Sequence, residues 1–231
     1  NDLQLFKALL NDGSQWGCNI SYAIQNQPKG IAESFIIAED FIDGDNVALI
    51  LGDNIFYFPS LSKLIASDIK NQGSTIFAYH VSDPSRYGVV EFTNDNQVIS
   101  ISEKPNKPKS NYAIPGFYFF DRKVVEYAKS LNPSSRGELE ITDVIMEYHK
   151  DNALNVFKMD KGTSWLDTGT VSSLMEAGQF VQVLEKRQGL KVGCVEEQAY
   201  LNKYIDANQL RSLAKRYNNG YGQYLTSLLN E

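Results

Sequence analysis

Cysteine and histidine are scarce in this chain of 231 residues, which contains two of each. Cys18 and Cys194 lie far apart and form no CxxC or Cys/His spacing, so neither a disulfide framework nor a zinc site is indicated. His80 and His149 fall in a predicted strand and a predicted helix, with no nucleophile at a readable spacing. A Ser-His-Asp or Cys-His hydrolase is therefore not supported.

Long apolar runs are missing as well. The longest covers residues 47–51, far short of the roughly 20 apolar residues that a membrane span needs, and no leader of charged and then apolar residues opens the chain. There are 22 basic against 28 acidic side chains, and the net charge of −6 argues against a partner such as nucleic acid or an anionic membrane. We therefore expect a cytoplasmic protein, in which an anionic substrate would need a local cationic pocket.

The rest of the composition is that of an ordinary globular protein. Apolar residues at 42% and charged residues at 22% exclude disorder, collagen and coiled coil as the main state. The length is enough for one large domain or two small ones. Because the chain opens with Asn1 and runs directly into a helical pattern, we expect it to be part of a longer protein.

Strand and helix patterns alternate along most of the sequence. Period-two alternation or a short apolar run predicts a strand, and apolar residues three or four apart predict a helix. Strands are expected at residues 18–25, 47–51, 75–81, 89–92, 97–103, 112–120 and 154–160. Helices are expected at residues 3–10, 31–41, 59–69, 138–150, 172–187, 206–217 and 220–229, with a further helix that ends at 131.

This order of elements predicts an α/β fold, with a mostly parallel mixed sheet flanked by helices, one inserted hairpin and a helical C-terminal tail. The unbroken apolar run at 47–51 is typical of a strand covered on both faces in such a sheet. We expect one domain over residues 1–189 and a C-terminal helical segment over residues 190–231. Such a sheet normally begins with a strand, a Gly-rich turn and a helix, and the first domain is expected to lack that strand and turn.

Two aspartates are candidates for a metal site. Asp53 directly follows the buried strand at 47–51, and Asp167 again stands after a strand and before a helix. Ligands of open α/β sheets lie beyond the carboxyl ends of the strands, and Mg²⁺ prefers carboxylate and phosphate oxygens. The two aspartates could therefore share one Mg²⁺. A turn residue at Asp53 and a helix cap at Asp167 remain the alternatives.

Two cations are candidates for binding a phosphate. Lys104 ends a predicted strand at the mouth of a loop, and Arg136 stands just before a helix whose free N–H groups also attract anions. Solvated surface side chains are the alternative for both. The segment 86–88 is interpreted as a turn in which Tyr87 packs its ring on the sheet.

Six motifs occur along the chain in one order. They are Leu51-Gly-Asp-Asn-Ile-Phe-Tyr57, Arg86-Tyr-Gly-Val-Val-Glu-Phe92, Glu103-Lys-Pro105, Ser110-Asn-Tyr-Ala113, Arg136-Gly-Glu-Leu-Glu-Ile-Thr-Asp143 and Trp165-Leu-Asp-Thr-Gly-Thr170. In this order the sequence resembles the glucose-1-phosphate thymidylyltransferases over essentially its whole length. Any one of the motifs is weak evidence, whereas six in register are highly specific.

The resemblance implies a Rossmann-like nucleotidyltransferase fold and the synthesis of dTDP-glucose and pyrophosphate from dTTP and glucose 1-phosphate. It also implies Mg²⁺ as cofactor, a role in nucleotide-sugar biosynthesis such as the dTDP-rhamnose pathway, and a homo-oligomer, a tetramer in the family. The roles implied for single residues are Mg²⁺ binding by Asp53 and Asp167, phosphate binding and catalysis by Lys104 and Arg136, the sugar pocket at Tyr87, Gly88 and Glu103, and thymine recognition at Gln25 and Gly30.

The sequence also departs from the family pattern. The family's Gly-rich loop would lie before Asn1, so we expect residues 1–231 alone to be nearly inactive. Phe58, Val171 and the loop from Gln25 to Gly30 differ from the usual residues. Two alternatives therefore stay open: a sugar-1-phosphate nucleotidyltransferase that uses UTP or CTP, and a non-catalytic relative that binds sugar nucleotides.

Overall fold

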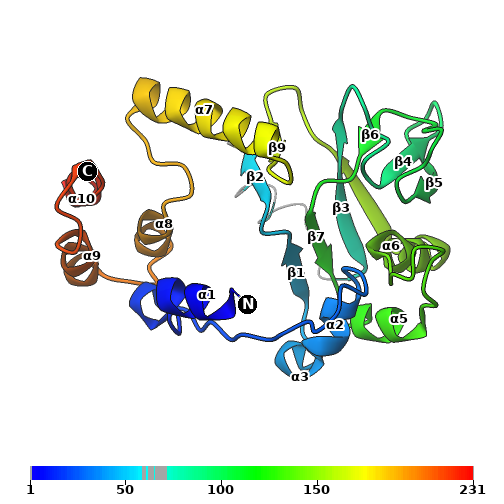
Figure 1. Ribbon diagram of the computed structural model, residues 1–231, viewed down its shortest axis with the longest axis horizontal. Helices are drawn as coiled ribbons and strands as arrows, with labels where there is room; N and C mark the ends of the chain where they lie inside the picture. Colours follow the sequence, from blue (N-terminus) through cyan, green and yellow to red (C-terminus); the bar gives the residue numbers. More distant parts are fainter. Residues whose placement is uncertain (1, 59–60, 62–64, 66–71, 231) are drawn as a thin grey trace. The chain divides into compact units, whose positions relative to one another are not determined.

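The computed structural model describes residues 2–58, 61, 65 and 72–230 (Figure 1). The chain forms two compact units, one of residues 25–177 and one that joins residues 1–24 to residues 178–231. The first residues group with the C-terminal helices because Trp16 packs against the buried side chains there. The division at residue 189 stays a prediction. No helix in the described residues combines the length and apolarity that crossing a membrane requires.

A seven-stranded sheet organises the unit of residues 25–177. Its order is β1-β7-β3-β6-β4-β5, and β8 pairs with β3 on the side of that path. These strands are β1 (Val47–Ile50), β3 (Ser74–His80), β4 (Val89–Phe92), β5 (Val98–Ser102), β6 (Tyr112–Ala113), β7 (Phe117–Phe120) and β8 (Leu154–Lys158). A separate two-stranded sheet pairs β2 (Asn54–Tyr57) with β9 (Ser164–Asp167).

The α/β class is confirmed, but the expectation of a mostly parallel sheet is wrong. Strand β7 pairs antiparallel with both β1 and β3, and β3–β8 is the one parallel pair among the described strands. Strands β1, β3 and β8 therefore do run in one direction, as alternating strands and helices predict, and β7 lies reversed between two of them. An apolar run reports how well a strand is covered, not the direction of its neighbour, and even Ile50 in β1 is 57% exposed.

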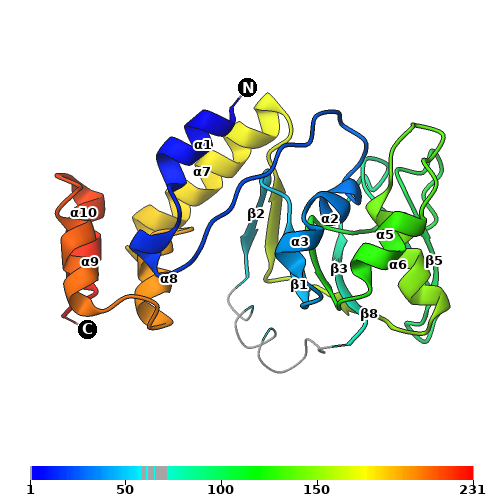
Figure 2. The same ribbon diagram turned by 90° about the horizontal axis from the view of Figure 1, so that it is seen from below.

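Helices cover one face of this sheet, as Figure 2 shows for α2 (Glu33–Ile37), α3 (Glu39–Ile42), α5 (Val124–Ser130) and α6 (Ile141–Lys150). Phe35 and Tyr148 from these helices pack with Ile76 and Phe120 of the sheet in one buried cluster. Because side chains alternate across a strand, Phe77 points to the other face, where its ring stacks on Phe117 with centroids 5.1 Å apart. The sheet is therefore apolar on both faces.

Several local predictions from the sequence differ from the structure. The segment 18–25 is extended but pairs with no strand in the described part of the chain. The helix expected at 31–41 divides at Ala38, and the strand expected at 112–120 divides at Pro115 and Gly116. A Cβ on Gly116 would lie 2.6 Å from the Leu51 side chain, so the chain passes too closely there for a larger residue. The helix expected at 59–69 falls mostly outside the described residues.

The other unit is helical. It contains α1 (Leu3–Leu10), the 3-10 helix η1 (Ser14–Trp16), most of α7 (Val171–Gln188), α8 (Val195–Leu201), α9 (Ala207–Ala214) and α10 (Gly220–Ser227). Leu210 and Leu225 are fully buried in it, and Asp206 and Gln209 form a capping box at the start of α9. Tyr221 and Tyr224 donate hydrogen bonds to Glu196 and Glu197.

Tyr217 is 39% exposed, whereas Tyr221 and Tyr224 of the last helix pack against the buried cluster of this unit. Leu228 packs there as well. Exposed apolar side chains of this unit include Leu5 and Leu9 of α1, at 69% and 71%, and Leu201 at the end of α8, at 61%.

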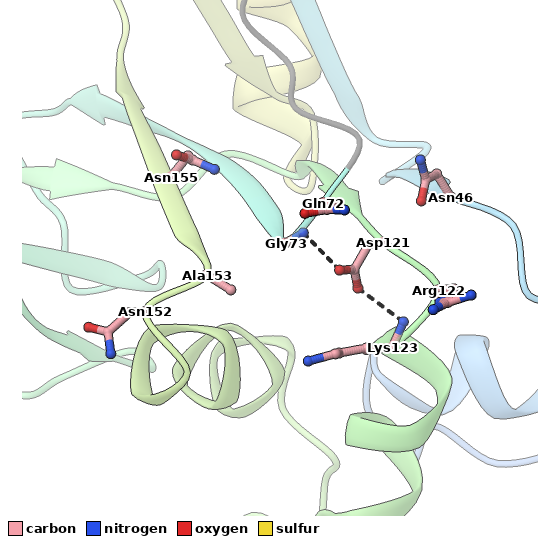
Figure 3. A pocket seen from close by; sticks show the side chains of 9 residues that line it. All are labelled: Asn46, Gln72, Gly73, Asp121, Arg122, Lys123, Asn152, Ala153 and Asn155. Carbon is pink, nitrogen blue, oxygen red and sulfur yellow. Dashed lines mark hydrogen bonds between the residues drawn. The ribbon is translucent and has the colours of Figure 1, made fainter.

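Asp121 joins three elements at the end of β7. Its Oδ2 accepts the Gly73 N–H at 2.8 Å, and its Oδ1 accepts the Tyr148 hydroxyl at 2.8 Å and the Lys123 N–H at 3.0 Å. Figure 3 shows the two backbone contacts in a hollow of about 770 Å³. Burial acts to raise the pKa of Asp121, but the hydrogen bonds that the carboxylate accepts outweigh burial and hold the pKa below its ordinary value.

We predict that Asp121→Ala lowers the free energy of unfolding at pH 7 by about 2–3 kcal/mol, because the Gly73 N–H loses its acceptor and the buried Tyr148 hydroxyl keeps only the longer bond to the Asp121 carbonyl oxygen, at 3.3 Å. Asp121→Asn keeps one acceptor oxygen and should cost about 1 kcal/mol. Denaturant unfolding measures both changes. Glu126→Ala, at an exposed site on α5, is the control.

The pH dependence gives a further check on Asp121. A carboxyl group with a lowered pKa in the folded state stabilises the fold above its unfolded pKa, about 3.9, and this stability is lost as the pH falls through the folded pKa. The difference in unfolding free energy between the natural protein and Asp121→Asn should therefore shrink below about pH 4. A difference that stays constant down to pH 2 would contradict this role of the charge.

Candidate active site

A cavity of about 450 Å³ lies within the unit of residues 25–177. It opens beyond the carboxyl end of β1, the edge at which ligands of α/β sheets bind, whereas the hollow of Figure 3 lies at the amino ends of β1, β3 and β8. Its described lining includes Asp53, Tyr87, Gly88, Glu103, Lys104 and Asp167, six of the residues predicted from the sequence.

The pairing of β2 with β9 brings Asp53 and Asp167 together. In this pair Asn54 stands opposite Asp167, and Thr168 donates both its backbone N–H and its hydroxyl to the Asp53 carbonyl oxygen, each at 2.8 Å. A Cβ on Gly169 would lie 3.1 Å from Asp167 Oδ1 and 3.7 Å from Asp53 Oδ2. The two carboxylate oxygens are thus separated by no more than the sum of these distances, which is compatible with one shared Mg²⁺.

The Asn54 side chain stabilises the position of Asp53 through a network of three hydrogen bonds. Its Oδ1 accepts the indole N–H of Trp165 at 2.7 Å and the backbone N–H of Gly116 at 3.0 Å, and its Nδ2 donates to Asp53 Oδ1 at 2.7 Å. One amide therefore ties β2, β9 and the start of β7 to an aspartate of the cavity. In the described residues no cluster of three or more His, Cys, Asp or Glu side chains could hold a metal, so a shared ion would complete its shell with water or substrate oxygens.

Asp167 has two further partners. The Tyr87 hydroxyl donates to its Oδ2 at 3.2 Å, and Arg86 Nη2 lies 3.5 Å from the same oxygen. Burial raises the pKa of Tyr87, and the charge of Asp167 raises it further, so the phenol stays a donor at neutral pH. The sequence analysis interpreted residues 86–88 as a turn and missed Arg86 as a lining cation.

Glu103 and Lys104 enter the cavity from the end of β5. Lys104 has a positive φ of 36° and donates its backbone N–H to the Tyr87 carbonyl oxygen at 3.1 Å. Its Nζ lies 3.8 Å from Glu103 Oε1. Burial raises the pKa of Glu103, and the nearby charge of Glu140 raises it further, while Thr142 donates its hydroxyl to Glu103 Oε2 at 3.2 Å.

Gly88 allows the close packing in this corner. A Cβ at this position would lie 2.9 Å from Thr142 Cγ2 and 3.6 Å from Glu103 Oε2. Its backbone carbonyl accepts the Ile114 N–H at 2.8 Å. The absence of a side chain therefore lets the turn before β4 lie directly against α6.

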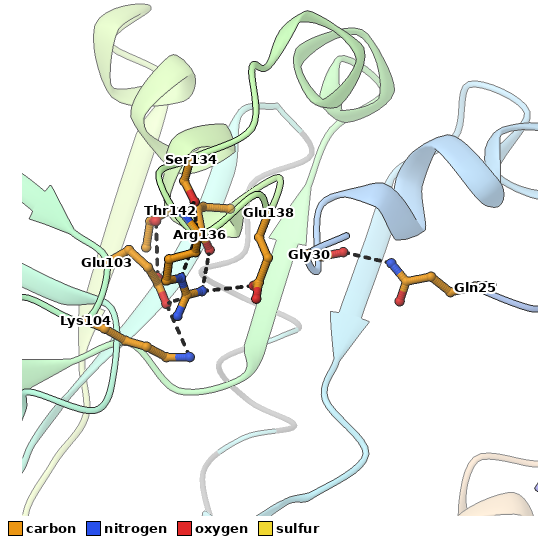
Figure 4. Close-up of polar contacts among 9 residues, drawn as sticks. Gln25, Gly30, Glu103, Lys104, Ser134, Arg136, Glu138 and Thr142 are labelled. Carbon is orange, nitrogen blue, oxygen red and sulfur yellow. Dashed lines mark hydrogen bonds and ion pairs between the residues drawn. The ribbon is translucent and has the colours of Figure 1, made fainter. Parts of the chain in front are cut away.

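Arg136 stands beside the cavity and is surrounded by carboxylates (Figure 4). It donates from Nε and Nη2 to the two oxygens of Glu140 at 3.1 and 3.0 Å, and from Nη2 to Glu138 at 2.9 Å. Its Nη2 also lies 3.8 Å from Glu103 Oε1. The hydrogen bonds with Glu140 raise the pKa of Arg136, so the guanidinium is charged and already engaged.

Gln25 and Gly30 lie apart from the group around Arg136 in Figure 4. Gln25 Nε2 donates to the Gly30 carbonyl oxygen at 3.0 Å and to Glu33 Oε2 at 2.6 Å. Gly30 has φ of 101°, and a Cβ there would lie 2.2 Å from the Leu139 carbonyl oxygen, so only glycine fits. Ile31, the next residue, lines the cavity. Thymine recognition by Gln25 and Gly30 stays a prediction.

The supporting residues Asn54, Thr168 and Trp165 were not predicted from the sequence. Two of them stand directly beside a predicted aspartate, so the signal that could have found them was the adjacency of polar residues to Asp53 and Asp167. The role of these residues depends on the pairing of the four-residue strands β2 and β9, and no local sequence pattern predicts which two strands pair.

Comparison with known proteins identifies the family of the chain. The model of the nucleotidyl transferase family matches residues 1–183. A glucose-1-phosphate thymidylyltransferase from Mycolicibacterium smegmatis is 50% identical over 99% of this chain and 80% of its own length. The enzyme of that name from Xanthomonas campestris is 49% identical over 97% of this chain and 77% of its own.

A solved structure has the same fold. A Bacillus anthracis protein assigned as a glucose-1-phosphate thymidylyltransferase and crystallised with sucrose is 37% identical, with a TM-score of 0.69 over 77% of this chain and 71% of its own. The extent of these matches decides the family. The chain belongs to the nucleotidyl transferase family and, within it, to the glucose-1-phosphate thymidylyltransferases.

Proposed function

We propose that this protein transfers a nucleotidyl group from dTTP to glucose 1-phosphate, which yields dTDP-glucose and pyrophosphate. The observation that carries the proposal is the placement of Asp53 and Asp167 in one cavity with Glu103 and Lys104. In the reaction a phosphate oxygen of the sugar substrate forms a bond to the α-phosphorus of dTTP. The bond from that phosphorus to the bridging oxygen breaks, and pyrophosphate leaves with the electron pair.

Asp53 and Asp167 would hold the Mg²⁺, because an oxygen of each lies within 3.7 Å of the Cβ position of Gly169. When bound, the ion supplies neutralisation of the charge on the phosphate oxygens. Tyr87 keeps Asp167 in place through its hydroxyl. The clamp of Thr168 on the Asp53 carbonyl oxygen fixes the backbone beneath the other carboxylate.

Lys104 and Arg136 would bind the phosphate of the sugar substrate, and Tyr87, Gly88 and Glu103 would line the sugar. The raised pKa of Glu103 reflects a carboxyl group withdrawn from water, as expected of one that accepts a sugar hydroxyl. Transfers of this kind need little covalent help from the protein, so positioning and charge neutralisation provide most of the rate.

We predict that the full-length protein prefers dTTP over the other nucleotides. Pyrophosphate release with glucose 1-phosphate, measured across dTTP, UTP, CTP and ATP, tests this. The Gln25 amide already donates hydrogen bonds to Gly30 and Glu33, so a nucleotide base would have to displace or extend these bonds, and UTP and CTP remain the alternatives. A preference for CTP or ATP would contradict the assignment of dTTP as substrate. If none of the four nucleotides led to pyrophosphate release, a non-catalytic binding protein would be favoured.

We predict that Asp53→Asn and Asp167→Asn each lower kcat by about 10²-fold or more, because each removes a charged oxygen from the proposed metal pair. Binding of Mn²⁺, followed by its paramagnetic signal, should weaken in both variants while the melting temperature is retained. Asp95→Asn, in the exposed turn between β4 and β5, changes the net charge equally and is the control. Full activity of the double variant would defeat the metal-pair assignment.

We also place the protein in the cytoplasm, within nucleotide-sugar biosynthesis such as the dTDP-rhamnose pathway, and as a homo-oligomer. The support for assembly is the apolar surface of α1, where Leu5, Phe6 and Leu9 are each more than half exposed. We predict a mass above that of the monomer, and a tetramer by family resemblance, in light scattering of the full-length protein. A monomer at all concentrations would refute this.

A further inference from the structure

Glu138 and Glu140, which flank Leu139 in the sequence, both form hydrogen bonds with Arg136. The two glutamate side chains differ in burial. The Glu140 side chain is 7% exposed and the Glu138 side chain is 37% exposed. Both accept from the same nitrogen, Nη2, at 3.0 and 2.9 Å. Glu140 additionally accepts from Nε at 3.1 Å, so its contact with the guanidinium is bidentate, whereas that of Glu138 is single.

Glu140 is fixed independently of Arg136. Its Oε1 accepts the Ser134 hydroxyl at 2.7 Å, and its backbone carbonyl accepts the Asp143 N–H at the start of α6. A buried carboxylate that loses its cation is left with an uncompensated charge, so separating this pair costs more free energy than separating an exposed one. The plane of the Arg136 guanidinium is therefore set by Glu140.

The backbone carbonyl of Glu138 accepts the Ser134 N–H at 2.8 Å, but within the described residues its side chain is held through Arg136 Nη2 and by no second donor. An exposed carboxylate loses little when it turns to water, because solvent screens the pair. The carboxylates of Glu103, Glu138 and Glu140 also outnumber the cations Lys104 and Arg136 around this point. A dianionic phosphate that approaches Arg136 thus meets excess negative charge, and the exposed Glu138 is the member that can leave.

We propose that Glu140 and Glu138 act on Arg136 in opposite senses: Glu140 positions the guanidinium for the substrate phosphate, and Glu138 competes with that phosphate for it. The proposal rests on the proposed function, in which Arg136 binds the phosphate of the sugar substrate. In this proposal Glu138 competes with the substrate phosphate for Arg136 and thereby raises KM for glucose 1-phosphate. Glu140 is a positioning residue.

We therefore expect that replacing each glutamate by glutamine changes KM for glucose 1-phosphate in opposite directions. Glu138→Gln removes the competing charge and should lower KM for glucose 1-phosphate by about two- to tenfold, a larger change than any in kcat. Glu140→Gln turns an amide toward Arg136 and should raise KM by about tenfold or more. A purely structural role of this segment would raise KM in both variants.

The experiment measures KM for glucose 1-phosphate at saturating dTTP in the full-length protein, together with the affinity for inorganic sulfate by calorimetry. Sulfate is a tetrahedral dianion, so its affinity should rise in Glu138→Gln and fall in Glu140→Gln even when no reaction occurs. Glu126→Gln, exposed on α5, makes the same change in net charge and should alter neither quantity. If Glu140→Gln fails to fold, Ser134→Ala removes the hydroxyl that donates to Glu140 Oε1 and accepts the Arg136 backbone N–H, and it should raise KM by about threefold.

The results separate this inference from the proposed function. An active enzyme in which Arg136→Gln raises KM, but Glu138→Gln raises it too or leaves it unchanged, overturns the competitor role alone. An active enzyme in which Arg136→Gln has no effect overturns the inference and leaves nucleotidyl transfer in place. If no nucleotide releases pyrophosphate, the function fails, and the opposite shifts in sulfate affinity still decide between the two roles.

Discussion

The short pairing of β2 with β9 is the contact on which the site depends. It sets Asn54 opposite Asp167, and this register places Asp53 beside the partner aspartate although the two are far apart in sequence. The Asn54 amide bonds to Trp165, Gly116 and Asp53, so the same small sheet is tied to β7 and thereby to the main sheet. A shift of one residue in this register would turn each side chain of one strand to the other face and separate the carboxylates.

Several of the other lining residues of the cavity lie at the ends of strands or in the turns beside them. The turn before β4 presents Tyr87, the end of β5 presents Lys104, and the backbone bond between these two residues fixes their spacing. Gly88 permits this only because it has no side chain to collide with Thr142 at the start of α6. Secondary structure therefore supplies the positions, and a few hydrogen bonds of side chains supply the orientation.

Much of this architecture could be predicted from local sequence, and the failures have physical causes. The hairpin of β4 and β5 and the helices α5 and α6 follow from strong periodicity and clear turn residues. The segment 18–25 alternates just as well but has no strand beside it in the described residues, and pairing is a non-local property. Asp53 and Asp167 could be proposed from the sequence because ligands of α/β sheets bind beyond the carboxyl ends of the strands. The carboxylates around Arg136 stood in the same motif, yet their burial, which gives them different roles, is invisible in the sequence.

Charge balance links the acidic composition of the chain to its proposed chemistry. The described lining of the cavity carries the carboxylates of Asp53, Glu103 and Asp167 against the cations Arg86 and Lys104. A cavity with this excess of negative charge repels nucleotide and sugar phosphates unless further positive charge enters with them. A divalent cation held by Asp53 and Asp167 would reverse the local sign, since it would bring two positive charges to this group of carboxylates. On this reasoning the carboxylates that the fold brings together are the physical basis for the proposed use of Mg²⁺, which would offset the charge that opposes the binding of phosphates.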